Sequence, residues 1–285
     1  MSDESSDGGF ANWQAYYYDP SMAAAVIFII LYGIVTALHT YHLFRTRTWF
    51  FIPMVLGGYF EFIGYIGRAL SSSQTPDWTL GPYIMQSVLL LVAPALFAAS
   101  IYMYLGRIII LVRGEKYSLI RVSWMTKIFV AGDVLSFLMQ ASGAGILVTN
   151  NPSTGENIIV GGLFVQIIFF GFFVICSFIF QRRVNSNPTA LGNASTTPWR
   201  KHLWALYASS VLILIRSIFR VIEYLQGYDG YLLRNEAFIY VFDALLMFFV
   251  LGVFVIVHPS EVNVLLGRGR VMVTKGGLSV AEAGV

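Results

Sequence analysis

The sequence predicts an all-α membrane protein, a bundle of seven transmembrane helices with its N-terminus outside and its C-terminus in the cytosol. Hydrophobic residues make up 57% of the 285 residues and charged residues only 12%, whereas soluble domains carry about 25% charged residues. Seven apolar stretches are each long enough to cross a bilayer, which takes about 20 residues. Lys and Arg gather in alternate loops between these stretches. Together these observations place the chain in the integral membrane class.

Each predicted span is a run of mostly apolar residues that ends where polar or charged residues begin. The first span follows an aromatic segment ending at Tyr18, which suits a membrane interface, and stops before Arg45. The third span is the longest, so we expect it to tilt or to extend past the lipid. Pro94 near its middle removes one backbone hydrogen bond and favours a kink. The seven predicted spans are Met22–Phe44, Phe50–Leu70, Tyr83–Val112, Trp124–Val148, Ile159–Gln181, His202–Leu225 and Glu236–Val257.

Positive charge alternates between the loops and so indicates the orientation. The N-terminal tail and the loops after the second and fourth spans contain no Lys or Arg, and the loop after the sixth has only Arg234. Because cytosolic loops collect positive charge, the N-terminus is expected outside. The basic residues of the remaining loops and of the C-terminal tail are Arg45, Arg47, Arg113, Lys116, Arg121, Arg182, Arg183, Arg200, Lys201, Arg268, Arg270 and Lys275.

The chain divides into three expected parts. Residues 1–21 form an extracellular tail, residues 22–258 the seven-helix transmembrane domain, and residues 259–285 a flexible cytosolic tail. The first 21 residues lack the basic start and cleavage site of a signal peptide, so the first span is expected to insert uncleaved. The tail from Glu261 onward is Gly-rich and weakly patterned, which favours flexibility.

Length and composition exclude several functional classes. The spans use nearly the whole chain, so we expect no soluble catalytic domain and no enzyme activity. The net charge of +3 is too small to suggest a nucleic acid partner. The single cysteine, Cys176, cannot form an intramolecular disulfide. The sequence has no phosphate-binding Gly-x-x-x-x-Gly-Lys loop, so we expect neither ATP hydrolysis nor a bound cofactor.

Polar residues recur three or four positions apart inside four of the spans, so they share one face of each helix. A charged residue at a helix centre costs about 2.5–3.5 kcal/mol of insertion free energy, and the simplest packing therefore turns these stripes toward one another. Gln86 in the third span and Gln166 in the fifth add single amides. The stripes are Gly57, Glu61, Gly64 and Arg68; Asp133, Ser136, Gln140 and Gly143; Ser209, Arg216, Arg220 and Glu223; and Glu236, Tyr240 and Asp243.

Ionisable residues inside a membrane are by default candidates for a substrate or proton pathway. The predicted depths place Glu61 near the midplane and Asp133 nearer the cytosol. An alternative interpretation is that these charges pair only to fix the register of the helices. We predict no catalytic residue and no metal ligand. The residues predicted to bind or translocate a substrate are Glu61, Arg68, Gln86, Asp133, Gln140, Arg216, Arg220, Glu223 and Asp243.

Short motifs along the whole membrane region resemble those of the fungal RTA-like proteins, the lipid-translocating exporter family of seven-span membrane proteins. The resemblance implies seven helices, an outside N-terminus and transport of amphipathic molecules, with sphingoid long-chain bases as the best-known case. Resistance to toxic sterol-like amines and movement of porphyrins are linked to other members of that family. The motifs are Tyr18-Asp19-Pro20-Ser21, Gly57-Gly58-Tyr59-Phe60-Glu61, Pro82-Tyr83-Ile84, Arg216-Ser217-Ile218-Phe219-Arg220 and His258-Pro259.

The first functional hypothesis is a translocator or exporter of lipid-like molecules. Glu61, with Asp133 and Asp243, would receive an ammonium head group, while an apolar seam between helices would hold the tail. Arg216 and Arg220 would instead bind a phosphate or carboxylate head group. We expect an integral, multi-pass protein of the plasma membrane, whose partners are the lipid bilayer and the amphipathic substrate. The sequence does not indicate an oligomeric state.

Two other functional classes stay open at the level of sequence. A seven-span receptor for a lipid-like ligand fits the orientation, although the cytosolic loops are short. An intramembrane zinc hydrolase acting on lipids needs three or four ligands, and His39, His42, His202 and His258 all lie near the cytosolic ends of spans. A retinal protein is excluded, because the seventh span contains no lysine.

Overall fold

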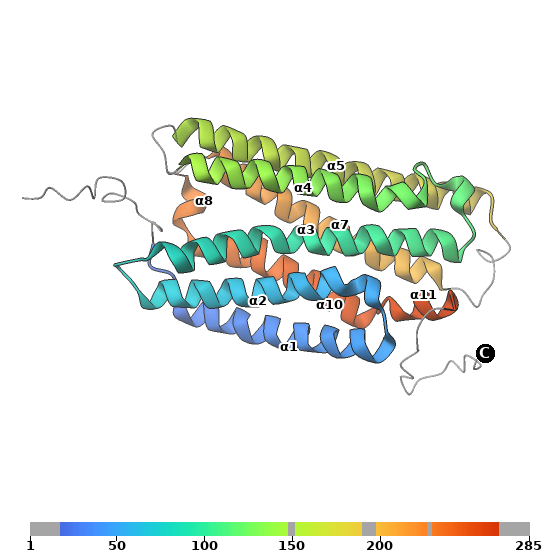
Figure 1. The fold of residues 1–285 in the computed structure, drawn as a ribbon, viewed down its shortest axis with the longest axis horizontal. Helices are drawn as coiled ribbons and strands as arrows, with labels where there is room; N and C mark the ends of the chain where they lie inside the picture. The colour runs from blue at the N-terminus through green and yellow to red at the C-terminus, as the bar shows by residue number, and fades with distance from the viewer. Residues whose placement is uncertain (1–17, 148–151, 190–197, 227–229, 268–285) are drawn as a thin grey trace, which may run out of the picture.

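The structure is a computed structural model that describes residues 18–147, 152–189, 198–226 and 230–267. Its long helices run side by side along one axis, as Figure 1 shows. Seven of them are long and apolar enough to cross a membrane, and the described residues contain no strand. The predicted all-α bundle of seven transmembrane helices is therefore confirmed, and the chain is an integral, multi-pass membrane protein; the orientation of its termini stays a prediction.

Most helix boundaries lie within a few residues of the predicted ones. The fifth differs most, because its helix runs for 35 residues and begins at Pro152, a residue favoured in the first helical turn. The elements are α1(Met22–Thr46), η1(Trp49–Phe51), α2(Ile52–Ser73), α3(Leu80–Leu111), η2(Glu115–Tyr117), α4(Val122–Leu147), α5(Pro152–Ser186), α7(Trp199–Leu225), α8(Tyr231–Arg234), α9(Glu236–Ile239), the π-helical η3(Tyr240–Ala244), α10(Leu245–Ile256) and α11(Ser260–Leu265).

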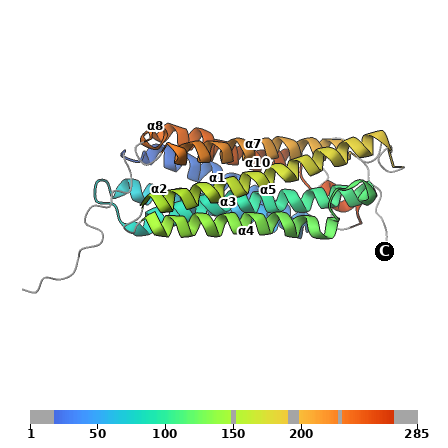
Figure 2. The same ribbon diagram turned by 90° about the horizontal axis from the view of Figure 1, so that it is seen from above.

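The seventh span is composite, because α9, η3 and α10 follow one another without a break. α2 packs between α1 and α3, whereas α4 packs mainly against α5. α7 contacts α3, α5 and α10, so it joins the two groups of helices. Figures 1 and 2 show this arrangement, with α4 and α5 on one side and α7 and α10 behind α3.

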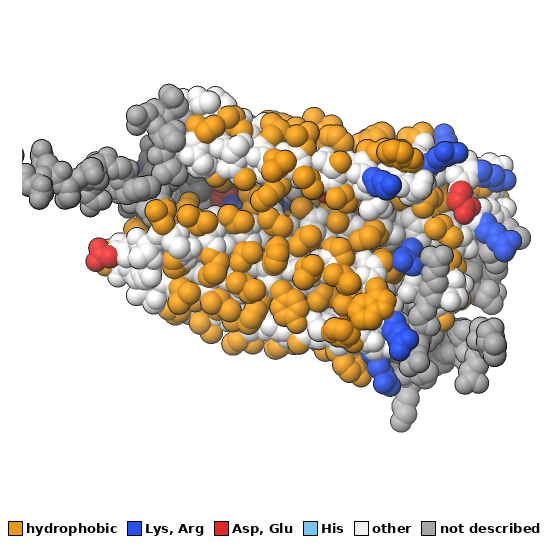
Figure 3. Space-filling model, viewed as in Figure 1, with side chains coloured by type: hydrophobic (Ala, Val, Ile, Leu, Met, Phe, Trp, Pro, Cys, Tyr) orange, Lys and Arg blue, Asp and Glu red, His pale blue; other side chains and the backbone are white. Residues whose placement is uncertain are grey.

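Aromatic side chains fill much of the space between α1, α2 and the seventh span. Phe28 stacks on Tyr65 with ring centroids 5.4 Å apart and on Tyr240 at 5.3 Å. Tyr32 stacks on Tyr65 at 5.5 Å. Large apolar side chains such as Ile27 on α1 remain exposed on the outside of the bundle, and Figure 3 shows them covering the sides of the molecule. This surface is suited to lipid.

Lys and Arg side chains gather at one end of the bundle in Figure 3. We call it the basic end; it carries the α1–η1 and α3–α4 connections and α11. The other, opposite end carries Tyr18, the α2–α3 connection and α8. This asymmetry is the one on which the predicted orientation depends.

The C-terminal tail differs from the expectation of flexibility. It begins with α11, in which Val262 and Asn263 are buried. Asn263 Oδ1 accepts a hydrogen bond of 2.5 Å from Arg107 Nη1 on α3, and this contact orders the segment. Residues 268–285 lie outside the described part of the chain.

Close contact between α4 and α5 depends on glycines. A Cβ atom added at Gly143 would lie 2.7 Å from the backbone oxygen of Gly155 and 2.9 Å from the backbone nitrogen of Ile159. Backbone atoms cannot move aside as a flexible side chain can, so the two helices would have to separate. Gly145 on the same helix has no heavy atom within 4 Å of the equivalent position.

We therefore expect Gly143→Ala to lower the free energy of unfolding by about 1–3 kcal/mol, the usual cost of overpacking. Gly145→Ala is the matched control and should be neutral or stabilising by up to about 1 kcal/mol, because alanine favours a helix. Thermal unfolding of the purified protein in detergent measures both. Equal midpoints for the two variants would contradict the close packing of α4 on α5.

Candidate functional site

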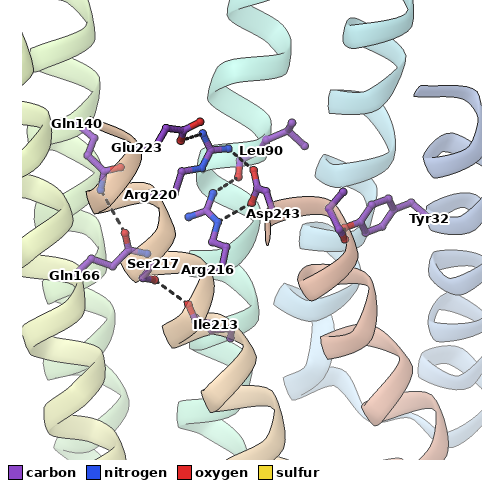
Figure 4. Close-up of polar contacts among 11 residues, drawn as sticks. Tyr32, Leu90, Gln140, Gln166, Ile213, Arg216, Ser217, Arg220, Glu223 and Asp243 are labelled. Atoms are coloured by element: carbon purple, nitrogen blue, oxygen red, sulfur yellow. Dashed lines mark hydrogen bonds and ion pairs between the residues drawn. The ribbon is translucent and has the colours of Figure 1, made fainter. Parts of the chain in front are cut away.

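A network of buried ion pairs lies between α7 and the seventh span, as Figure 4 shows. Arg216 Nε donates to Asp243 Oδ1 at 2.7 Å, and Arg216 Nη2 donates to the backbone oxygen of Leu90 at 3.1 Å. Arg220 Nη2 donates to the other Asp243 oxygen, and Arg220 Nη1 donates to Glu223 Oε2 at 2.9 Å. One carboxylate thus bridges two guanidinium groups.

Helical spacing and a π-helical stretch bring these residues together. Arg216, Arg220 and Glu223 share one face of α7 because they are four and three residues apart. Asp243 lies in η3, where the backbone widens into a π-helix, a feature that often marks functional sites. Tyr32 on α1 donates to the backbone oxygen of Ala244 at 2.7 Å. No sequence pattern indicates the π-helix, and little indicates a role for Tyr32, whose hydroxyl lies within an apolar span.

Glu61 on α2 completes the network, and we call Glu61, Arg216, Arg220, Glu223 and Asp243 the polar core. Glu61 is 1% exposed and lies close enough to Asp243, Arg216 and Arg220 for their charges to act on it. The hydroxyl of Tyr32 is beside it. Its Oε1 atom is buried and has no hydrogen-bond partner among the described residues.

Small residues on α2 allow this deep position. A Cβ atom at Gly57 would lie 2.6 Å from Phe97 Cε1, and one at Gly64 would lie 2.7 Å from Leu90 Cδ2. α3 therefore packs closely against the α2 face that carries Glu61. The glycines of this stripe serve helix approach.

The polar core carries one carboxyl group more than its arginines neutralise. Two guanidinium groups face three carboxyl groups, and Asp243 and Glu223 already make the ion pairs. An ionised carboxylate buried without a counter-charge costs several kcal/mol of free energy. Glu61 is therefore neutral when the site is empty, or it is matched by a cation that is not part of the chain.

The polar core lies beside a furrow in the side of the bundle. Figure 3 shows acidic and basic atoms within a furrow between α3 and α4, in the half away from the basic end, and Figure 1 places α7 behind this gap. The side chain of Arg220 on α7 is 16% exposed and that of Glu223 is 4% exposed. A molecule dissolved in the membrane can therefore approach the polar core from the side.

Arg68 lies in a separate network at the opposite end. Its Nη2 atom donates to Glu236 Oε1 at 2.7 Å and to the Tyr18 hydroxyl at 2.8 Å, and its Nε atom donates to the Tyr240 hydroxyl at 2.9 Å. The backbone nitrogen of Ser21 donates to both oxygens of Glu236 at 2.9 Å. These contacts tie the start of α1 to the seventh span.

The other predicted site residues lie outside the polar core. Gln86 is buried on α3 one turn before Leu90. The α4 stripe faces α5 instead of the other stripes: Ser136 donates to the backbone oxygen of Gly162 at 2.7 Å, and Gln140 Nε2 donates to Ser136 Oγ at 2.6 Å. The expectation that all four stripes meet is wrong for α4, because its small residues are used in the close contact with α5.

The histidines cluster at the basic end without forming a metal site. His39 Nε2 donates to the backbone oxygen of Leu251 at 3.0 Å, and the rings of His42 and His258 are 4.9 Å apart. Burial, together with the neighbouring histidines, lowers the pKa of His258 to about 3, so its ring is neutral at physiological pH. Within the part of the chain that the structure describes, no three His, Cys, Asp or Glu residues are placed to hold a metal ion.

His202 connects α7 to the two elements beside it. The Tyr104 hydroxyl and His202 Nδ1 share a hydrogen bond of 2.5 Å, and His202 Nε2 lies 3.1 Å from Glu261 Oε2. The hydrogen bond with His202 holds the pKa of the Glu261 carboxyl below its ordinary value. This contact fixes α11 against α7 and α3.

Comparison with known proteins shows one family and several named relatives. Residues 54–264 match the family described as RTA1 like protein. The chain is 42% identical to "Protoporphyrin uptake protein 1" of Saccharomyces cerevisiae, over 87% of this chain and 92% of that protein. It is 31% identical to "Probable lipid transporter atnI" of Emericella nidulans, over 90% and 70%.

A third relative has a more specific name. The chain is 27% identical to "Sphingoid long-chain base transporter RSB1" of Saccharomyces cerevisiae, over 85% of this chain and 72% of that protein. No solved structure matches this chain significantly.

Proposed function

Since the chain belongs to the RTA1-like protein family and is similar to proteins named as lipid transporters, we propose that it translocates amphipathic molecules with a cationic head group. Sphingoid long-chain bases are the substrate class that fits best. The observation that carries this proposal is the fully buried carboxyl of Glu61, which makes no ion pair among the described residues and whose Oε1 atom has no hydrogen-bond partner there, beside an ion-pair network that is already balanced.

An ammonium head group supplies the missing counter-charge. It would replace the proton on Glu61 and make a charge-assisted hydrogen bond, which is stronger than a neutral one. Asp243 keeps its ion pairs with Arg216 and Arg220, so the head group meets a preformed site. The apolar tail would lie in the furrow between α3 and α4, against side chains that otherwise face lipid.

A porphyrin is the second candidate, because the relative with 42% identity is named for protoporphyrin uptake. Its two carboxylate groups would need free guanidinium groups. Arg216 and Arg220 instead engage Asp243, Leu90 and Glu223. The chemistry of the polar core therefore favours a cation over a dicarboxylate.

Transport by the purified protein in lipid vesicles tests the proposal. We expect saturable flux of a labelled long-chain base, competition by other long-chain amines, and no competition by the N-acetylated base, which carries no charge. The transported base should be recovered unmodified and without added ATP, as expected of a translocator and not of an enzyme. Flux equal to that of protein-free vesicles would overturn the proposal, and saturable flux of protoporphyrin alone would favour the second candidate.

We also propose that the protein resides in the plasma membrane with its N-terminus outside. An exporter removes a cytotoxic amphiphile from the cell when it moves the molecule across the plasma membrane. Surface labelling of an N-terminal tag on intact cells tests both parts, since a tag that only permeabilised cells expose would contradict them.

A further inference from the structure

Asp133 on α4 is a buried carboxyl that the polar core does not use. Its side chain is 5% exposed, and neither carboxyl oxygen makes a hydrogen bond of normal geometry within the described residues. The hydroxyl of Tyr102 on α3 is the polar group that faces it. Burying an ionised carboxylate in such surroundings is costly, so this carboxyl carries a proton or has a bound cation.

No positive charge of the neighbouring helices faces Asp133. α4 packs against α5 and α3. α5 has no charged residue between Glu156 and Arg182, and Cys176 is the one titratable residue between them. Arg107 is the single charged residue of α3, and it points to Asn263 on α11. A salt bridge within the described bundle therefore does not neutralise Asp133.

Aromatic rings surround the Tyr102 side of this carboxyl. The ring centroid of Tyr102 lies 4.6 Å from that of Phe173 on α5 and 5.3 Å from that of Phe129 on α4. Phe129 is one turn before Asp133 and shares its helix face. Such packing leaves little room for a hydrated ion, whereas a proton needs no space.

Asp133 is also remote from the polar core. Tyr102, which faces it, lies twelve residues after Leu90, which accepts a hydrogen bond from Arg216. At about 1.5 Å per residue, these two points on α3 are about 18 Å apart along the helix. Asp133 is thus displaced toward the basic end and does not contact a head group bound at Glu61.

We propose that Asp133 is a proton-binding site that couples movement of the amphiphile to a proton gradient, an inference that rests on the proposed function. The carboxyl takes up a proton from the more acidic side and releases it to the other side when the surrounding helices admit water. The proton and the cationic amphiphile move in opposite directions. No covalent bond to the substrate forms or breaks, and the gradient supplies the free energy.

The test uses the full chain in vesicles and a long-chain base carrying a trimethylammonium group, which cannot lose a proton and so does not redistribute passively with pH. Two modes are compared: exchange of labelled for unlabelled base without a gradient, and accumulation into vesicles with an acidic lumen. For the wild type we expect both. For Asp133→Asn we expect exchange within twofold of the wild type and loss of at least tenfold in gradient-driven accumulation.

Matched controls separate loss of the titratable carboxyl from other effects of an Asp-to-Asn substitution on transport. Asp77→Asn makes the same chemical change in an exposed loop and should leave both modes unchanged. Asp133→Glu keeps a titratable carboxyl and should restore part of the accumulation. In addition, the infrared absorption of protonated carboxyls should be weaker in Asp133→Asn than in the wild type by the contribution of one group, because Glu61 still contributes; this readout does not depend on transport.

Each outcome decides the question. Gradient-driven accumulation that persists in Asp133→Asn would overturn the proposal. Loss of exchange in Asp133→Asn, or failure of that variant to fold, would overturn it too, because Asp133 would then serve binding or structure. Absence of exchange in the wild type would overturn the proposed function, and this inference with it, whereas exchange without gradient-driven accumulation in the wild type would overturn the inference alone.

Discussion

Asp243→Asn is expected to lower the free energy of unfolding by about 3–5 kcal/mol, the cost of breaking a buried ion pair by removing one partner. Asp243 is the single carboxylate that bridges Arg216 and Arg220. With a neutral amide in its place, Arg216 loses the charge that neutralises it, although its hydrogen bond to the backbone oxygen of Leu90 remains. A buried, unmatched guanidinium would remain beside the η3 backbone.

Denaturant titration of the purified protein in detergent micelles measures this loss. Asp77→Asn on an exposed loop is the control and should change the free energy of unfolding by less than about 0.5 kcal/mol. Replacing both partners with apolar residues, Arg216→Met with Asp243→Leu, should destabilise less than Asp243→Asn alone, because no unmatched charge is left at that pair. Equal effects of Asp243→Asn and Asp77→Asn would show that the ion pairs contribute little.

The fold was largely predictable because a membrane restricts the structures that can cross it. Runs of about 20 apolar residues have to be helices whose backbone groups are satisfied internally, so the lengths of the spans followed from composition alone. The order of α11 was missed for a different reason. It depends on a contact between Arg107 and Asn263, which are distant in the sequence.

The site was predictable only in part. Helical spacing correctly grouped Arg216, Arg220 and Glu223 on one face of α7, and these residues meet Asp243 and Glu61. The spacing of residues along a helix does not specify which neighbouring helix their shared face contacts. The α4 stripe is directed to α5 by Gly162, and Arg68 is held by Glu236 at the opposite end. The π-helical stretch that presents Asp243 depends on the packing around it and has no sequence pattern.

Glu61→Gln is expected to slow transport at least tenfold without loss of stability. Glutamine has nearly the shape of a protonated glutamate, so the empty protein should fold and unfold as the wild type does. In Glu61→Gln, an ammonium head group can no longer make a charge-assisted hydrogen bond to a carboxylate at this position. The binding free energy lost is about 1.5–3 kcal/mol, which corresponds to at least a tenfold loss of affinity. Glu156→Gln on α5 is the control, because it removes a carboxylate outside the polar core.

The most direct test of a cation site at Glu61 is the exchange rate, without a pH gradient, of a labelled long-chain base with a primary ammonium group in vesicles, compared between the wild type, Glu61→Gln and Glu156→Gln at matched protein density. We predict that Glu61→Gln slows exchange at least tenfold, with an unchanged unfolding midpoint, while Glu156→Gln exchanges as the wild type does. Exchange by Glu61→Gln at the wild-type rate and with the same half-saturating concentration would contradict the account.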